Sequence, residues 1–260
     1  MSKIAAAFQK QHKCFIPFIT AGDPELETTR RLIIAMANAG ADIIELGIPF
    51  SDPVAEGEVI QAANIRALAA GTTTDKIFAM LAEVRKETNV PLVFLTYVNP
   101  IFTYGTEKFM AACQNTGVDG IIVPDVPYEE KAELAGLCAQ YGVDLIPLVA
   151  PTSDERIKMI AGEAQGYVYI VSSLGVTGVR QDITTDIAAM TEKIRQATDV
   201  PAAVGFGIAT PKQAEEMAAV SDGAIVGSVV VKIVGKYGTD CVQPVSDYVK
   251  EMAEAVHKVQ

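Results

Sequence analysis

The sequence predicts a single-domain (β/α)8 barrel, a TIM barrel of the α/β class, that spans residues 1–260. Eight short apolar runs recur along the chain, and each is followed by a longer segment with helical periodicity. The runs are almost continuous in apolar residues, as are strands of a parallel sheet covered by helices. Eight such units fill the 260 residues, and no Pro-, Gly- or Ser-rich linker divides them. An open, doubly wound parallel sheet is the alternative architecture.

The eight predicted strands share a high content of residues that favour extended structure. They are CFIPFIT (14–20), ADIIELG (41–47), PLVFLTY (91–97), DGIIVPD (119–125), VDLIPLV (143–149), YVYIVSS (167–173), PAAVGFG (201–207) and DGAIVGS (222–228). Three of them follow a glycine at which a helix is expected to end in the left-handed conformation, namely Gly40, Gly117 and Gly142.

Two segments between the strands carry clear amphipathic patterns, LETTRRLIIAMANAG and TDKIFAMLAEVRKET. Apolar side chains recur in both at the spacing that places them on one stripe of a helix. The stripes consist of Leu32, Ile33, Met36 and Ala37 in the first segment and of Ile77, Met80, Leu81 and Val84 in the second. Both segments are therefore predicted to cover the outer face of the barrel.

Composition narrows the functional class. The formal net charge is -11 and the basic residues are scattered, which argues against nucleic acid as a partner. No apolar run approaches the ~20 residues that a membrane helix needs. The N-terminus MSKIAAAFQKQHK lacks the apolar core of a signal peptide, so we expect a cytoplasmic protein with no membrane association.

The cysteines and histidines exclude several kinds of site. The four cysteines, Cys14, Cys113, Cys138 and Cys241, lie far apart and are expected to be buried free thiols. The only histidines, His12 and His257, lie near the ends of the chain, which removes the HExxH metal motif and makes a Ser-His-Asp relay improbable. Proton transfer would therefore fall to carboxylates, tyrosines or lysines.

A carboxylate stands inside the second predicted strand. Glu45 is flanked by Ile43, Ile44 and Leu46, near the carboxyl end of the strand, where the reactive groups of a barrel are found. One interpretation is that Glu45 points outward and pairs with a lysine on a covering helix. The other is that it points into the barrel mouth, where burial would raise its pKa and allow proton exchange near neutral pH.

A long loop follows this strand, GIPFSDPVAEGE, and carries Asp52, Glu56 and Glu58. It exceeds the usual two to six residues of a βα connection, and its prolines and glycines favour turns. A long loop over the active face suggests a lid or a surface that contacts a partner. Solvated acids are the simpler interpretation of Asp52 and Glu58.

Glycines cluster in the loops after the last three strands, in SSLGVTGVRQDI, GFGIATPKQ and GSVVVKI. The late loops of a barrel and a short helix N-terminus commonly form a phosphate site, because bare backbone N–H groups can approach an anion there. The candidates are Gly178, Gly207, Gly227 and Ser228. Any one of these glycines taken alone is explained by a turn.

Two further polar residues lie at strand ends. Tyr169 lies within YVYIVSS, and Asp125 ends DGIIVPD. Tyr169 either packs in the barrel or faces a ligand. Asp125 either caps the turn into the following helix or faces a ligand.

The segment LGIPFSDPVAEG, which follows IIE, resembles the signature of the tryptophan synthase α subunit family. The segments FIPFITAGDP, VPDVP, YVYIVSSLGVTG, GFGI and AIVGS match the family's other landmarks in the same order, over residues 13 to 250. The resemblance implies a lyase that cleaves indole-3-glycerol phosphate to indole and glyceraldehyde 3-phosphate without metal or organic cofactor. It also implies that the indole passes to a pyridoxal-phosphate β subunit within an α2β2 assembly.

The resemblance also assigns roles to residues of this sequence. Glu45 matches the catalytic acid and base, Glu56 a second carboxylate beside the indole N–H, and Tyr169 the substrate-pocket tyrosine. Phe18, Tyr97 and Ile122 match the indole pocket, and Asp125 an acid that supports it. Thr177 matches a residue that contacts the loop acid on closure, and the four phosphate candidates fall on matched positions.

Two positions depart from the family pattern, since Glu56 replaces the usual Asp and Glu58 the usual Pro. The longer side chain of Glu56 keeps the charge but changes its reach, and catalytic geometry is sensitive at about the 1 Å level. Three alternatives follow: another phosphate-binding barrel with a related substrate, a free-standing lyase that releases indole, and a regulatory subunit that binds the phosphate ligand without turnover.

Overall fold

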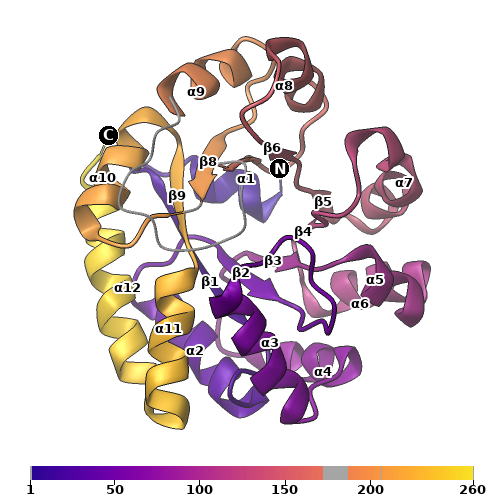
Figure 1. The fold of residues 1–260 in the computed structure, drawn as a ribbon, viewed down its shortest axis with the longest axis vertical. Coiled ribbons are helices and arrows are strands. Elements are labelled where there is room, and N and C mark those ends of the chain that lie inside the picture. The colour runs from indigo at the N-terminus through magenta and orange to yellow at the C-terminus, as the bar shows by residue number, and fades with distance from the viewer. Residues whose placement is uncertain (1, 172–186, 206, 260) are drawn as a thin grey trace.

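The computed structural model describes residues 2–171, 187–205 and 207–259. In this part of the chain, parallel strands form one sheet that curls into a barrel, and the helices form a ring around it (Figure 1). The strands are β1 (Cys14–Thr20), β2 (Ile44–Gly47), β3 (Leu92–Leu95), β4 (Gly120–Ile122), β5 (Asp144–Leu145), β6 (Leu148–Val149), β7 (Val168–Val171), β8 (Ala202–Gly205) and β9 (Gly223–Val226). Their order in the sheet is β5-β4-β3-β2-β1-β9-β8-β7-β6.

The first and last strands in that order come from one predicted run, residues 143–149. Ile146 and Pro147 interrupt the run, and proline has no N–H to donate to a ladder. The Ile146 N–H nevertheless donates to the Ile121 carbonyl at 2.9 Å, and the Pro147 carbonyl accepts from the Tyr169 N–H at 2.9 Å. The barrel prediction is therefore confirmed, with the fifth strand divided in two.

The helices connect successive strands and pack against their outer faces. Those before β5 are α1 (Lys3–Phe8), α2 (Leu26–Asn38), α3 (Glu58–Ala69), α4 (Thr74–Val84), α5 (Val98–Tyr104), α6 (Thr106–Thr116), the 3-10 turn η1 (Tyr128–Glu130) and α7 (Ala132–Tyr141). Those after it are α8 (Asp154–Ala161), α9 (Ile187–Arg195), α10 (Pro211–Val220), α11 (Ser228–Tyr237), η2 (Gly238–Asp240) and α12 (Val242–His257).

The predicted stripes lie on α2 and α4. Seven of their eight residues are buried, and Ala37 is half-buried. Gly117 and Gly142 end α6 and α7 in the left-handed conformation, as predicted. Gly40 has a φ of 107°, outside the left-handed helical region, and lies one residue beyond the end cap of α2.

Alternate residues of the strands face the interior of the barrel, where Ile16, Ile43, Val93 and Ile225 form one apolar cluster. Ile4 of α1 belongs to the same cluster, so α1 closes the amino-terminal end of the barrel inside the ring of helices (Figure 1). The opposite, carboxyl-terminal end carries the loops after the strands.

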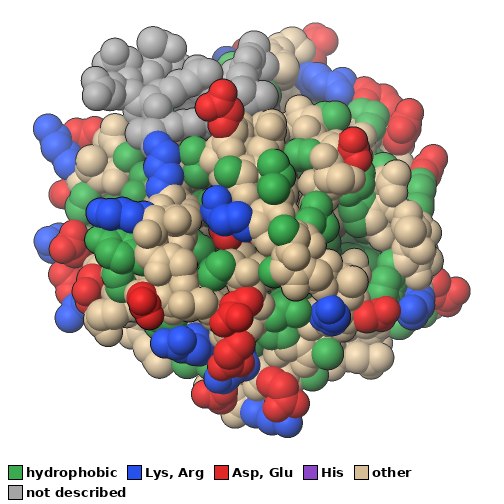
Figure 2. All heavy atoms as spheres, turned by 60° about the horizontal axis from the view of Figure 1, so that its bottom comes forward, with side chains coloured by type: hydrophobic (Ala, Val, Ile, Leu, Met, Phe, Trp, Pro, Cys, Tyr) green, Lys and Arg blue, Asp and Glu red, His purple; other side chains and the backbone are tan. Residues whose placement is uncertain are grey.

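All four cysteines are buried free thiols, which confirms that prediction. No helix in the described ranges combines the length and apolarity needed to cross a membrane. On the face shown in Figure 2, acidic and basic side chains are interspersed over the helices.

Candidate functional site

Glu45 lies on the inner face of the barrel, at the level of Phe18 on β1 and Val93 on β3. Residues in register on neighbouring parallel strands point to the same side of the sheet, and Val93 belongs to the interior cluster. The interpretation that Glu45 points outward to pair with a lysine is therefore wrong. Its partner is the hydroxyl of Tyr167, which lies 2.6 Å from Oε1.

The environment of Glu45 favours its protonated form. Its side chain is almost fully buried, and the Tyr167 hydrogen bond is a neutral contact in place of a cation. Burial raises the pKa of Glu45 to about 8, although the Tyr167 hydrogen bond lowers it in part. Glu45 can therefore give up a proton at neutral pH and take it back.

Tyr169 also faces the barrel interior, two residues beyond Tyr167 on the same side of β7. A Cβ atom added to Gly205 of the neighbouring strand would lie 2.2 Å from the Tyr169 hydroxyl oxygen. Gly205 therefore leaves the space that this hydroxyl occupies. Burial first, and then the charge of Glu45, raise the pKa of Tyr169 well above its usual value, so the phenol is neutral.

Phe18 and Ile122 complete the apolar part of this inner surface. Phe18 is held between two glycines on the flanking strands: a Cβ on Gly47 would lie 2.7 Å from its Cζ, and one on Gly227 would lie 3.4 Å from its Cδ1. Ile122 ends β4, is fully buried, and packs in the same interior cluster as Tyr169. Glu45 and Tyr169 thus sit among apolar side chains at the carboxyl ends of the strands.

Glu56 is buried as well, with 6% of its surface exposed. Asn64 of α3 donates to its Oε2 at 2.6 Å, and the Gln61 side chain donates to its backbone carbonyl at 2.7 Å. Burial raises the pKa of Glu56 to about 7, while hydrogen bonds from Asn64 and Tyr97 lower it in part. This carboxylate is anchored to the first turns of α3, in contrast to Asp52 and Glu58, which are exposed as the simpler interpretation expected.

Tyr97 and Asp125 tie the loop after β2 to neighbouring units. The Tyr97 hydroxyl accepts a hydrogen bond from the Ala55 N–H at 3.1 Å, and its ring packs against Phe50 at 5.4 Å between centroids. Asp125 accepts from the Val98 N–H at 3.1 Å. It therefore caps α5 of the preceding unit, and the expected cap on the helix that follows Asp125 is wrong.

Three of the four phosphate candidates lie in the described residues. Gly207 has a φ of 81°, which favours glycine. Gly227 is the N-cap of α11, a ten-residue helix that begins at Ser228, so its first N–H groups lie beside the end of β9. Gly178 and also Thr177 lie outside the described residues.

Sequence reasoning missed Tyr167, Asn64 and Gly205. Tyr167 and Tyr169 stand at strand spacing, so the same alternation that placed Tyr169 inside was a signal for Tyr167. Asn64 lies two helical turns after Glu56, yet only the fold of the loop brings the two side chains together. The glycine within the strand pattern of PAAVGFG was a signal for a close approach at Gly205.

Comparisons with known proteins agree with this geometry. The family model described as "Tryptophan synthase alpha chain" matches residues 4–258. The tryptophan synthase alpha chain of Lacticaseibacillus casei is 48% identical over 256 residues, which cover 98% of this chain and 96% of the relative. That of Alkaliphilus metalliredigens is 45% identical over 255 residues, or 97% of this chain and 96% of the relative.

Solved structures show the same fold. Tryptophan synthase subunit alpha from Legionella pneumophila superposes with a TM-score of 0.89 at 34% identity, covering 100% of both chains. A chain of the tryptophan synthase complex from Pyrococcus furiosus superposes with a TM-score of 0.84 at 33% identity, covering 94% of this chain and 98% of that one.

Proposed function

The chain belongs to the tryptophan synthase alpha chain family, and on this premise we propose that it cleaves indole-3-glycerol phosphate to indole and glyceraldehyde 3-phosphate. The observation that carries the proposal is the buried carboxyl of Glu45, whose pKa of about 8 makes it a proton donor at neutral pH. The apolar surroundings of Phe18 and Ile122 suit an indole ring, whose face is apolar.

Glu45 acts first as an acid and then as a base. Its proton goes to the indole ring carbon that carries the glycerol phosphate side chain, which makes the ring a cation and a competent leaving group. The resulting carboxylate then takes the proton of the side-chain hydroxyl, the carbon–carbon bond breaks, and its electrons return to the ring. Neutral indole and an aldehyde are released, and Glu45 is protonated again.

Glu56 stabilises the cation formed in the first step. A carboxylate placed beside the indole N–H offsets the positive charge that develops on the ring nitrogen. With a pKa of about 7, Glu56 is partly ionised in the free protein, and a cation beside it favours the ionised form. Asn64 holds one oxygen of the carboxylate, which limits where the longer side chain can reach.

The phosphate is assigned to the loops after the last strands. Gly207, Gly227 and Ser228 would present backbone N–H groups, and the N-terminus of α11 adds the positive end of a helix dipole. Thr177 and Gly178 are assigned to the same end of the barrel by the family motif. The Tyr169 hydroxyl, held in the space above Gly205, orients the substrate next to Glu45.

We assign the loop after β2 and helix α5 as the surface for a tryptophan synthase β subunit in an α2β2 assembly. Val54 of the loop is 74% exposed and Phe102 of α5 is 50% exposed, and exposed apolar side chains of this size favour a protein interface. Tyr97 connects the two segments, because its hydroxyl accepts from Ala55 and its backbone leads into α5. Docking there would act directly on Glu56.

A cleavage assay with indole-3-glycerol phosphate, with and without added β subunit, tests the proposal. We expect cleavage that increases when the β subunit is present. Glu56→Gln should lose activity, whereas Glu58→Gln, which changes the neighbouring exposed acid, should keep it. Substrate binding without cleavage in both states would instead support the regulatory subunit, and cleavage indifferent to the β subunit would support a free-standing lyase.

A further inference from the structure

The two histidines of the chain meet at the amino-terminal end of the barrel, although 245 positions separate them. His12 lies in the connection from α1 to β1, and His257 is the last residue of α12. Their rings lie 3.9 Å apart between centroids. Asp42, just before β2, lies between them and the backbone of β1.

The three side chains present a convergent set of ligand atoms. His257 Nε2 lies 2.7 Å and His12 Nδ1 lies 4.0 Å from Oδ2 of Asp42. All three atoms lie within 4.8 Å of one another. A tetrahedral zinc ion with bonds of about 2.0–2.1 Å holds its ligand atoms about 3.4 Å apart. Side-chain movements on the order of 1 Å would therefore bring the three atoms to that spacing.

Charge and access also suit a cation. Asp42 is buried, and although burial raises its pKa, hydrogen bonds from His257, Lys10 and Phe15 bring the pKa below the usual value. Asp42 is therefore a carboxylate at neutral pH. The imidazoles are partly exposed, with 28% and 26% of their side-chain surfaces accessible to solvent.

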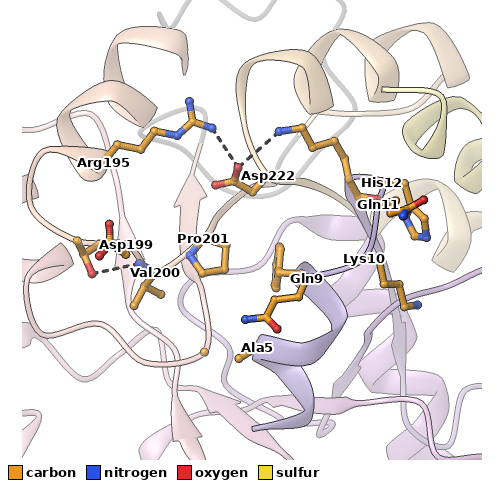
Figure 3. Close-up of a pocket in the computed structure, with 14 residues that line it drawn as sticks. Ala5, Gln9, Lys10, Gln11, His12, Arg195, Asp199, Val200, Pro201 and Asp222 are labelled. Carbon is orange, nitrogen blue, oxygen red and sulfur yellow. Dashed lines mark hydrogen bonds and ion pairs between the residues drawn. The ribbon is translucent and has the colours of Figure 1, made fainter. Parts of the chain in front are cut away.

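An entry path lies beside the cluster. His12 lines a cavity of about 970 Å³ at this end of the barrel, on the side opposite Arg195 and Asp199 (Figure 3). Lys13 and Arg195, two of the basic residues of this cavity, pair with Asp222, at 3.5 and 3.0 Å. Lys10 is the cation that faces the cluster, because its Nζ lies 2.5 Å from Oδ1 of Asp42.

We propose that His12, Asp42 and His257 form a binding site for one divalent first-row transition metal ion of the zinc type, with solvent as the fourth ligand. Two imidazoles and a carboxylate form a ligand set typical of such ions. The site joins the first loop, the start of β2 and the end of the last helix, so a bound ion holds the C-terminal helix to the base of the barrel. Because the ligands come from three distant segments, no sequence motif indicates the site.

The position separates this site from the proposed chemistry. Asp42 precedes β2, whereas Glu45 faces the interior further toward the carboxyl end of that strand. The nearby thiol of Cys14 is fully buried, and burial together with the Asp42 charge raises its pKa well above the usual value, so it stays protonated. The ion is therefore held by nitrogen and oxygen and is assigned a stabilising role.

Metal titration of the chelator-treated full chain tests the proposal. Calorimetry with Zn²⁺ should give one site per chain, and Co²⁺ should give the visible absorption of a four-coordinate nitrogen and oxygen site. Affinity should fall as the pH drops through about 6.5, where imidazoles become protonated. Zn²⁺ should also raise the unfolding temperature, since it binds only the folded chain.

Matched variants decide between a built site and adventitious binding. His12→Gln and His257→Gln should each weaken Zn²⁺ at least about tenfold. Lys10→Met should tighten it by about tenfold, because it removes the cation that competes for Asp42. Lys13→Met, at the same cavity but paired with Asp222, should leave the affinity unchanged. Absence of stoichiometric Zn²⁺ binding, or equal binding by the two histidine variants and the parent, would overturn the proposal.

Discussion

The hydroxyl of Tyr167 lies 2.6 Å from Oε1 of Glu45, across the interior of the barrel, and both side chains are buried. These residues are 122 positions apart in the sequence and belong to β2 and to the position just before β7. A neutral phenol solvates a carboxylate less than a cation would, so Glu45 keeps a high pKa. The contact therefore orients the acid without ionising it.

Removing this hydroxyl should raise the pKa of Glu45 further, because the Tyr167 hydrogen bond lowers it. A hydrogen bond to a charged group contributes about 1.5–3 kcal/mol, so Tyr167→Phe should shift the alkaline limb of kcat/KM upward by about one pH unit or more. Tyr141→Phe is the matched control, since the Tyr141 hydroxyl bonds Glu107 on the surface at 3.1 Å. An unchanged limb in Tyr167→Phe would separate this hydrogen bond from the proton transfer.

The rate of cleavage should depend on pH in a bell shape. Glu56 must be ionised to stabilise the cationic ring, so kcat/KM rises as the pH passes about 7. Glu45 must be protonated to act as the acid, so kcat/KM falls as the pH passes about 8. Glu56→Gln should lower the maximum and remove the acidic limb, whereas a limb that persists would belong to another group.

Burial of Glu45 should also make stability depend on pH. The pKa is 4.5 in the unfolded chain and about 8 in the folded one, so the folded state binds the proton more tightly and stability falls as the pH rises between these values. Glu45→Gln removes this cost. It should stabilise the protein by up to roughly 4 kcal/mol at pH 8 and by almost nothing near pH 4. Denaturant unfolding of both proteins at several pH values measures the difference, and a constant difference contradicts the account.

A methyl group at Gly205 should displace Tyr169, because the added Cβ would lie 2.2 Å from its hydroxyl oxygen. We expect Gly205→Ala to cost about 1–3 kcal/mol of stability and to raise KM for indole-3-glycerol phosphate. Gly136→Ala is the control, since an added Cβ there meets nothing within 4 Å. Gly136 lies inside α7, so alanine should stabilise that helix by up to about 1 kcal/mol. Unchanged activity and stability in Gly205→Ala would contradict the close packing.

The sequence predicts the barrel well because its signals are local and repeated. The apolar pattern places Leu32 and Met36 on the buried face of α2, and Gly117 and Gly142 end their helices where the pattern stops. The division of the fifth strand at Pro147 is a local effect that the run of apolar residues concealed.

The candidate site is only partly predictable, because its contacts join distant segments. Periodicity left open which way Glu45 points, and the register with Phe18 and Val93 decides it. The loop composition suggested a mobile acid at Glu56, yet Asn64 anchors that carboxylate. A hydrogen bond between residues eight positions apart across a loop and a helix depends on the loop's path, which composition does not determine.

The rate of indole-3-glycerol phosphate cleavage by Glu45→Gln, measured at pH 7.5 with β subunit present, tests the central claim most directly. Glutamine keeps the size of the side chain and can accept from Tyr167 but cannot donate a proton as an acid. We expect the folded variant to bind substrate and to cleave it at least about a hundredfold more slowly than the parent protein. A folded variant that cleaves the substrate within a few-fold of the parent rate would contradict the assignment of Glu45 as the acid.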